Sequence, residues 1–204
     1  MRLLLVDDHE VVRRGLAFMI NDQPDMEVVG EAASGAEAVE LFRKQTPDLV
    51  LMDLRLPDMT GIECAAELRG IAEEARIVIL TTFSGNEHIY RAMKAGVRAY
   101  LFKDMAGDVI MGALRTVHAG GTFLPPPIAT SLAQRLTEAE LSQREIAILK
   151  ALAKGASNKD IGRQLDIAES TVKGHMNHLL SKLRARDRTE AVTIALRRGL
   201  ITLD

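Results

Sequence analysis

The sequence predicts an α/β fold, a doubly wound parallel (βα)5 sheet, followed by a second domain that is all-α and has four helices. Five short apolar runs alternate with amphipathic stretches through the first 120 residues, and no strand-like run follows residue 140. Between these parts the pattern loosens, and the prolines at 125–127 cannot continue a helix. A chain of 204 residues is long enough for two domains of about 100 residues each. We therefore expect domains at residues 1–119 and 141–204, joined by a linker at 120–140.

The apolar runs are predicted to be buried strands. Each is too short for a helix and too uniformly apolar for a sheet with one face in water, which indicates parallel strands joined by helical crossovers. The predicted strands are Leu3–Val6, Val28–Ala32, Leu49–Met52, Ile77–Leu80 and Ala99–Phe102. The predicted helices of this domain are Val11–Ile20, Ala36–Gln45, Ile62–Arg69, Glu87–Ala95 and Val109–Ala119.

Helical spacing of apolar residues also defines the second domain. Its four predicted helices are Arg144–Lys154, Lys159–Leu165, Thr171–Leu183 and Glu190–Arg198. Ser157 can cap the second of them, because Asp160 follows three residues later, and a short turn at 166–168 precedes the third. This spacing predicts a helix-turn-helix.

The charge of the chain is divided unevenly between its two ends. Residues 1–120 carry 13 basic and 19 acidic side chains, a net charge of −6, whereas residues 141–204 carry 12 basic and 7 acidic side chains, a net charge of +5. A basic module after an acidic one indicates that the C-terminal part is the one that meets a polyanion.

The composition narrows the class of protein. The single cysteine, Cys64, has no partner for a disulfide, which fits a reducing cytoplasm and excludes a cysteine-based zinc site. The apolar run that ends at Val6 is too short for a secretory signal, and no apolar stretch is long enough to span a bilayer. We expect a cytoplasmic protein with no membrane partner.

Polar side chains follow four of the predicted strands. Asp7 and Asp8 follow the first strand, Asp53 the third, Thr81 the fourth and Lys103 the fifth. Ligands of an open parallel sheet bind outside the carboxyl ends of its strands, so these side chains are expected to share one pocket. Three neighbouring carboxylates repel one another unless a cation neutralises them, and Mg²⁺ is the natural hard cation for oxygen ligands. Asp53 can then attack a phosphoryl group while Lys103 and Thr81 stabilise charge on its oxygens.

Each of these residues also has an ordinary structural explanation. An acidic pair after a strand is more often a solvated loop or a helix cap than a metal site, and a single lysine there is more often a surface side chain. The coincidence of carboxylates, a hydroxyl and an amine at the ends of four strands of one sheet favours a functional pocket.

Four sequence blocks resemble the receiver domains of two-component response regulators. They are LLLVDDHEVVRRGL, PDLVLMDLRLPDMTGIE, IVILTTF and GVRAYLFKD, and the resemblance spans residues 1 to about 119. It implies strand order 2-1-3-4-5 and Asp53 as the acceptor of a phosphoryl group from a sensor histidine kinase. It further implies that Mg²⁺ is held by Asp8, Asp53 and the backbone carbonyl of Arg55, with Asp7 assisting through water.

The same resemblance implies a switch pair, Thr81 and Tyr100. On phosphorylation the Thr81 hydroxyl would move toward the phosphate and the Tyr100 ring would turn inward to fill the vacated space. Without the resemblance, Tyr100 is a half-buried aromatic side chain on the last strand.

Two features depart from the commonest receiver pattern. Many receivers follow the lysine with a cis-proline, whereas Asp104 follows Lys103 here, so we expect a trans peptide bond, because a non-proline cis bond costs about 3 to 4 kcal/mol. The positions two beyond Asp53 and two beyond Thr81 are associated in the family with dephosphorylation rate, and here they are Arg55 and Phe83. A bulky Phe83 would restrict the attacking water or simply pack.

Residues 141–201 resemble the LuxR-type helix-turn-helix, which makes the predicted helix Thr171–Leu183 the recognition helix. Val172, Met176, Leu179 and Leu183 recur at positions i, i+4, i+7 and i+11 and form its buried stripe. The family pattern places Lys173, Gly174 and Asn177 at base edges in the major groove, with Lys159, Thr171, His175 and Lys182 at phosphates.

The LuxR resemblance also carries expectations about capping and partners. Ala168 stands where the family commonly has a serine or threonine, so the recognition helix is expected to lack its side-chain cap. The resemblance implies sequence-specific binding to double-stranded promoter DNA. It also implies a homodimer on DNA that forms through Glu190–Arg198, and it leaves room for contact with RNA polymerase.

Three alternatives to a phosphorylation-controlled transcription regulator follow from the same residues. An aspartyl-phosphate phosphatase shares the Asp nucleophile and Mg²⁺ but has Asp-x-Asp, where this chain has Arg55. A ligand-sensing LuxR-type activator needs an aromatic-rich pocket, against an aromatic content of 3%. The third is a LuxR-type factor that works without phosphorylation. Under the main hypothesis the chain is no enzyme and catalyses only its own phosphorylation and dephosphorylation.

Overall fold

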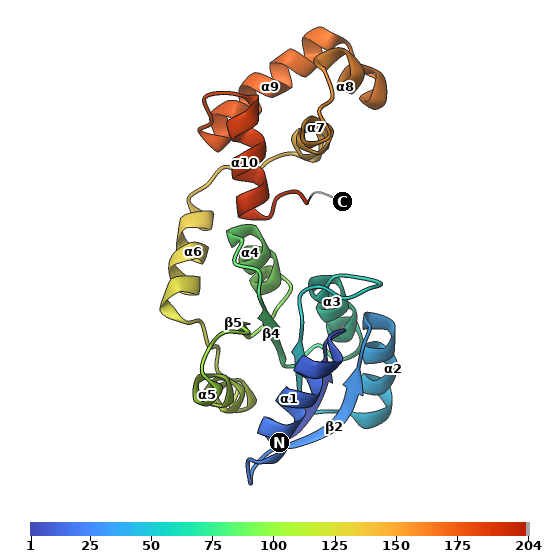
Figure 1. Cartoon of the computed structure of the whole chain (residues 1–204), viewed down its shortest axis with the longest axis vertical. Helices are drawn as coiled ribbons and strands as arrows, with labels where there is room; N and C mark the ends of the chain where they lie inside the picture. The colour runs from blue at the N-terminus through green and yellow to red at the C-terminus, as the bar shows by residue number, and fades with distance from the viewer. Residues whose placement is uncertain (203–204) are drawn as a thin grey trace. The chain divides into compact units, whose positions relative to one another are not determined.

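Five parallel strands form the sheet of the N-terminal unit in the computed structural model, which describes residues 1–202 (Figure 1). The strands lie in the order β2-β1-β3-β4-β5, and every neighbouring pair is parallel. Their bounds are β1 Arg2–Val6, β2 Glu27–Ala32, β3 Leu49–Met52, β4 Ile77–Thr81 and β5 Ala99–Phe102. The predicted fold class and strand order are therefore confirmed.

Five helices cover the two faces of this sheet (Figure 1). They are α1 Glu10–Asn21, α2 Gly35–Gln45, α3 Gly61–Ile71, α4 Asn86–Lys94 and α5 Gly107–His118. Successive strand side chains point to opposite faces, so Leu3, Leu5, Leu49 and Leu51 share one face, where they pack with side chains of α1 and α5 in a single core cluster. Apolar side chains on both faces explain why the central strands β3 and β4 are apolar along almost their whole length, whereas β2 at the edge of the sheet also carries Glu27 and Glu31.

The register of the sheet sets which residues meet at its carboxyl edge. Val6 pairs with Met52, so the residues that follow them, Asp7 and Asp53, are neighbours. Thr81 pairs with Phe102, which places Lys103 just beyond the end of β4. Parallel pairing thus gathers residues that are about 50 positions apart in the chain.

The helices of the second domain form a separate core. Their bounds are α7 Gln143–Ala153, α8 Asn158–Leu165, α9 Glu169–Leu183 and α10 Arg188–Arg198. Ile148, Leu149, Ile161, Val172 and Leu179 are fully buried in this core. All four predicted helices are present, with bounds that differ by at most two residues. As predicted, Ser157 caps α8 in a capping box with Asp160, and Ala168 gives α9 no side-chain cap.

One helix was not predicted. The segment 120–140 contains α6, Pro126–Leu136, where the sequence predicted only a linker broken by prolines. The prolines begin the helix instead of ending it, because the first amides of a helix need no partner within the helix. The amides of Ile128 and Ala129 donate to the carbonyl oxygen of Pro125, which starts the hydrogen-bond ladder.

The described part of the chain divides into two units, residues 1–84 with 89–130, and residues 85–88 with 131–202. Within residues 1–202, no helix has the length and apolar character needed to cross a membrane. The peptide bond between Lys103 and Asp104 is trans, as predicted, since the described residues contain no cis peptide bond.

Candidate functional site

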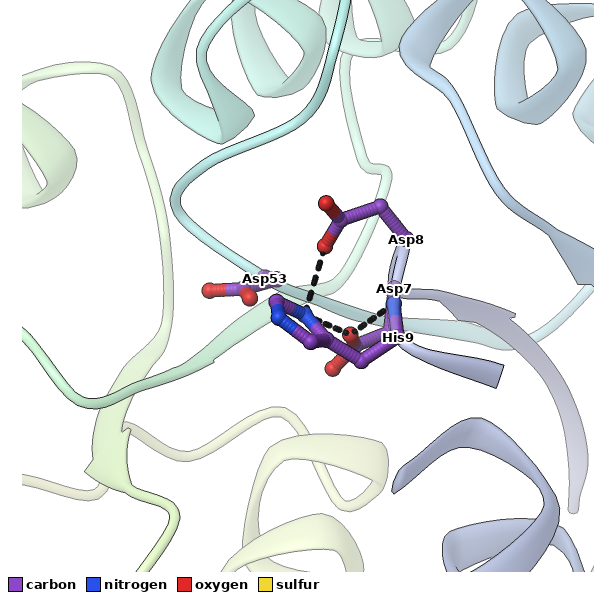
Figure 2. Close-up of side chains that lie close together, drawn as sticks. All are labelled: Asp7, Asp8, His9 and Asp53. Carbon is purple, nitrogen blue, oxygen red and sulfur yellow. Dashed lines mark hydrogen bonds and ion pairs between the residues drawn. The ribbon is translucent and has the colours of Figure 1, made fainter. Parts of the chain in front are cut away.

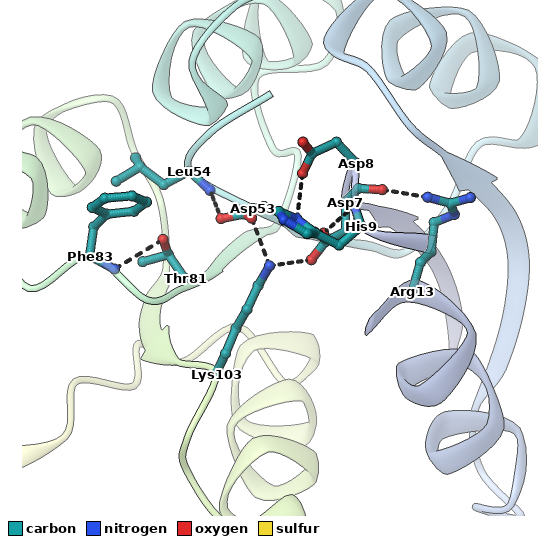
Figure 3. A network of polar contacts seen from close by, with 9 residues as sticks. All are labelled: Asp7, Asp8, His9, Arg13, Asp53, Leu54, Thr81, Phe83 and Lys103. Atoms are coloured by element: carbon teal, nitrogen blue, oxygen red, sulfur yellow. Dashed lines mark hydrogen bonds and ion pairs between the residues drawn. The ribbon is translucent and has the colours of Figure 1, made fainter. Parts of the chain in front are cut away.

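An acidic pocket lies at the carboxyl edge of the sheet, where Lys103 joins two aspartates (Figure 3). Its ammonium nitrogen is 2.5 Å from Oδ2 of Asp7 and 2.7 Å from Oδ2 of Asp53. Both carboxylates are buried, with 3% and 6% of each residue exposed. The Leu54 amide donates to Oδ1 of Asp53 at 2.6 Å. The sheet therefore brings together Asp7, Asp53 and Lys103, which the sequence placed just beyond the ends of three different strands.

The charge state of Lys103 follows from these contacts. Burial alone would lower the pKa of Lys103, but the hydrogen bonds to Asp53 and Asp7 outweigh it and raise the pKa above its ordinary value of 10.5. The ammonium therefore stays charged at neutral pH and can hold an anionic oxygen next to Asp53.

The pocket fits a divalent cation. Ligand atoms of Asp7, Asp8, His9 and Asp53 all lie within 4.8 Å of one another (Figure 2). Three ionised carboxylates against one ammonium leave a net charge of −2, which a divalent ion neutralises. Carboxylate oxygens are also the ligands that hard cations prefer. The Arg55 carbonyl, expected as a further ligand, stays a prediction.

Thr81 and Tyr100 both contact the backbone of Phe83. Thr81 is fully buried, and its hydroxyl oxygen accepts a hydrogen bond from the Phe83 amide at 3.3 Å. The Tyr100 hydroxyl donates to the Phe83 carbonyl at 2.8 Å, and the tyrosine is fully buried, which raises the pKa of its phenol. Sequence reasoning singled out the Phe83 ring, but this backbone link between the two expected switch residues is visible only in the structure.

The Phe83 ring contacts the side chain of Arg55. The Arg55 guanidinium carbon lies 3.8 Å from the centre of the ring, in a cation–π contact. The two residues that the sequence marked for dephosphorylation rate therefore contact each other.

Sequence reasoning missed three residues that shape this pocket. The Asp58 carboxylate accepts hydrogen bonds from the Gly35 and Ala36 amides at 2.8 and 2.9 Å, so it ties the loop after β3 to the first turn of α2. These bonds lower the pKa of Asp58. Gly61 packs against the Asp53 backbone so closely that a Cβ atom would overlap the Asp53 carbonyl oxygen. His9, the third, lies among the carboxylates (Figure 2).

The signals for these residues differ. Asp58 and its partners are 22 and 23 positions apart, so no local pattern reveals the contact. His9 follows the acidic pair directly, and its nitrogen ligand could have been noted from the sequence.

The expected recognition helix, α9, presents its predicted faces. Its buried residues are Val172, Met176, Leu179 and Leu183, the four of the predicted apolar stripe. The residues expected to contact DNA divide by exposure: Lys159, Thr171, Lys173, Gly174 and Asn177 are exposed, and His175 and Lys182 are partly buried.

Two lysines of α9 are held by carboxylates. Lys173 pairs with Glu169 one turn earlier at 3.0 Å, and both side chains are largely exposed. Lys182 donates at 2.8 Å to Glu145, whose side chain is only 4% exposed. Glu145 also accepts from the amide and hydroxyl of Ser142 in the capping box of α7. Lys182 is therefore a structural tie between α9 and α7, a role that the sequence did not indicate.

Comparison with known proteins matches each half of the chain to a known family. Residues 3–115 match the response regulator receiver domain, and residues 139–195 match the luxR family of bacterial regulatory proteins. The chain is 38% identical over 205 residues to the response regulator protein VraR of Staphylococcus epidermidis, with 98% of each chain covered.

Solved structures agree with this assignment. The response regulator ChrA of a heme-sensing two-component system is 35% identical and has a TM-score of 0.58, with 98% of both chains covered. The response regulator RcsB in its complex with DNA shares the fold at 19% identity and a TM-score of 0.74, with 99% of both chains covered. The chain therefore belongs to the response regulators of two-component systems, with an N-terminal receiver domain and a C-terminal helix-turn-helix domain of the LuxR type.

Proposed function

We propose that a sensor histidine kinase phosphorylates Asp53 and that this phosphorylation controls binding of the C-terminal domain to promoter DNA. The observation that carries the proposal is the buried Asp53 carboxylate at the end of β3, bonded to Lys103 and adjacent to Asp7 and Asp8. We propose further that the chain acts in the cytoplasm. The proposed domains are residues 1–119 and 141–204, and residues 120–140 are the linker between them.

The pocket supports phosphoryl transfer to an aspartate. An Asp53 oxygen attacks the phosphorus of the phosphohistidine donor, the bond between phosphorus and the imidazole nitrogen breaks, and an aspartyl phosphate forms. Lys103 then pairs with a phosphoryl oxygen as well as with Asp7. Asp8, Asp53 and the Arg55 carbonyl would hold Mg²⁺, with Asp7 assisting through water, and the bound ion would supply positive charge to offset the negative charge of the phosphoryl oxygens.

The contacts of Phe83 provide a route from the phosphate to the loop after β4. When the Thr81 hydroxyl turns to the phosphate, it gives up the hydrogen bond from the Phe83 amide. The Phe83 carbonyl is held by Tyr100, so the loop and the tyrosine respond together. Phosphorylation would thus bias an equilibrium between two arrangements of this loop.

The C-terminal domain reads DNA with α9. We assign base contacts to Lys173, Gly174 and Asn177, since lysine donates to guanine and asparagine pairs with adenine in the major groove. Phosphate contacts are assigned to Lys159, Thr171 and His175. Lys182 remains a phosphate contact only if its ammonium serves both Glu145 and DNA. The chain binds as a homodimer through α10, and the LuxR resemblance leaves room for contact with RNA polymerase.

The pocket favours a regulator over a phosphatase. Phosphatases that use an aspartate nucleophile typically place a second aspartate two residues later, and the residue at that position here, Arg55, lies over the Phe83 ring. We therefore propose that the chain catalyses only its own phosphorylation and dephosphorylation.

Phosphorylation of Asp53 is tested by mass spectrometry. Incubated with acetyl phosphate and Mg²⁺, the full-length protein should gain one phosphoryl group, and Asp53→Asn or a chelator should abolish the gain. Asp22→Asn, a change at the exposed aspartate that caps the C-terminal end of α1, is the matched control and should be phosphorylated like the wild type. A phosphoryl group that persists in Asp53→Asn would contradict the assignment, and steady turnover of a phosphomonoester would favour the phosphatase.

A further inference from the structure

The imidazole of His9 lies among the carboxylates of the acidic pocket (Figure 2). We propose that His9 is a ligand of the bound metal, and that the pocket therefore prefers divalent transition-metal ions such as Mn²⁺ over Mg²⁺. This inference rests on the metal site of the proposed function and adds a nitrogen donor to it.

The distances around His9 support a shared ion. Nδ1 of His9 is 2.8 Å from Oδ1 of Asp8 and 3.4 Å from Oδ1 of Asp7. Nitrogen and oxygen ligands bind divalent ions at about 2.0 to 2.3 Å, so two ligands on opposite sides of one ion are about 4 to 4.6 Å apart. The ligand atoms of the pocket lie within 4.8 Å of one another, so small side-chain rotations bring them onto one ion.

The backbone fixes His9 at the mouth of the pocket. Its amide donates to Oδ1 of Asp7 at 2.9 Å, and the residue is the N-cap of α1. Its side chain is 66% exposed and that of Asp8 is 39% exposed, so both have room to rotate toward an ion. The backbone of His9 is therefore fixed, while its imidazole can rotate toward a bound ion.

No basic side chain of α1 pairs with the carboxylates of the acidic pocket in the way that a bound metal ion would. Arg13 is the closest basic residue of that helix along the chain, and its guanidinium donates to the backbone carbonyl of Asp7 and to the Glu31 carboxylate. It leaves the pocket carboxylates to Lys103, which contacts Asp7 and Asp53. Asp8 is thus left to pair with His9 or with an ion that both residues bind.

The donor set decides which ions bind best. Mg²⁺ prefers oxygen ligands and retains its waters, whereas imidazole suits transition metals, whose affinity for mixed nitrogen and oxygen sites rises from Mn²⁺ toward Cu²⁺. One imidazole among carboxylates keeps the pocket able to bind Mg²⁺ and raises its affinity for Mn²⁺ relative to Mg²⁺.

Calorimetric titration of the full-length protein with Mn²⁺ and with Mg²⁺ tests the inference. In His9→Ala the affinity for Mn²⁺ should fall at least about tenfold, since even the loss of an outer-shell partner costs about 10- to 100-fold. The affinity for Mg²⁺ should fall less, so the ratio of Mn²⁺ affinity to Mg²⁺ affinity should fall. His118→Ala, a change at another half-exposed histidine of the same domain, should leave the ratio unchanged. Pulsed electron paramagnetic resonance of bound Mn²⁺ should show coupling to an imidazole nitrogen that His9→Ala removes.

An equal loss of both affinities in His9→Ala would overturn the inference, because His9 would then act only by holding Asp7 and Asp8. An unchanged ratio, or no nitrogen coupling in the wild type, would overturn it as well. Phosphorylation of the wild type by acetyl phosphate in Mg²⁺ separates the two proposals. If that reaction proceeds while the ratio is unchanged, only the role of His9 fails, and if it does not proceed, the proposed function fails.

Discussion

Gly61→Ala is expected to slow phosphorylation of Asp53 by about 100-fold, the cost of displacing a reacting group by about 1 Å. The added Cβ would overlap the carbonyl oxygen of Asp53, and the neighbouring backbone of Leu54 is in contact too. Backbone atoms cannot rotate away as a side-chain end can, so the loop after β3 must shift. The Leu54 amide that holds the Asp53 carboxylate shifts with it.

The same overlap should reduce stability. Overpacking of this kind typically costs about 1 to 3 kcal/mol in the free energy of unfolding. The rate of phosphorylation by acetyl phosphate measures the first effect. Unfolding of the same sample in urea measures the loss of stability. A variant with the wild-type rate and stability would mean that the loop does not hold Asp53 in place.

Gly70→Ala is the matched control, because Gly70 lies on the same helix, α3, and a Cβ there meets nothing within 4 Å. Alanine is favoured over glycine in a helix by about 0.5 to 1 kcal/mol. We expect this variant to be slightly more stable than the wild type and to be phosphorylated at the wild-type rate.

Glu145→Gln is expected to destabilise the C-terminal domain by about 1.5 to 3 kcal/mol at neutral pH, the usual contribution of hydrogen bonds to a charged group. The Glu145 carboxylate is buried and accepts from Ser142 and Lys182. The side chain of Lys182 is 33% exposed, so water partly solvates it, and the larger cost of breaking a fully buried pair is not expected.

The effect of Glu145→Gln should depend on pH. Burial alone would raise the pKa of Glu145, but the hydrogen bonds from Lys182 and Ser142 outweigh it and lower the pKa below its ordinary value of 4.5. A carboxyl group with a lowered pKa in the folded state stabilises the fold above its unfolded-state pKa and loses this contribution as the pH falls through the folded-state value. The difference between variant and wild type should therefore be full at pH 7 and shrink below about pH 4.5.

Hydrogen exchange of the buried amides of α7 and α9 in urea reports the free energy of opening of this domain alone. Glu169→Gln removes the partner of Lys173 in an exposed pair and should cost less than about 1 kcal/mol. Equal costs for the two variants, or a Glu145→Gln effect that grows at low pH, would show that the buried carboxylate does not tie α9 to α7.

The sequence predicted those parts of the structure that local patterns determine. The central strands β3 and β4 were found because both faces of the sheet are buried, so these strands are apolar along almost their whole length. Asp7, Asp53 and Lys103 were found because parallel strands end at one edge, whatever the separation along the chain. The apolar stripe of α9 was found because a helix with one buried face repeats at a fixed spacing.

Contacts between side chains distant in the sequence were not predictable in this way. Lys182 and Glu145 are 37 residues apart. In the sequence, a lysine on a recognition helix looks like a phosphate contact whether or not a carboxylate binds it in the structure. Asp58 meets α2 only through the packing of a loop. The start of α6 was misjudged because prolines that end a helix elsewhere are compatible with its first turn.

The central claim is that phosphorylation of Asp53 controls DNA binding, and one measurement tests it most directly. Genomic fragments that bind the phosphorylated full-length protein are selected, and the dissociation constant for one of them is measured with and without acetyl phosphate and Mg²⁺. We expect phosphorylation to tighten binding at least about fivefold, the lower end of typical coupling between two sites. Asp53→Asn should bind like the unphosphorylated wild type under both conditions. The same dissociation constant for phosphorylated and unphosphorylated wild type would contradict the account.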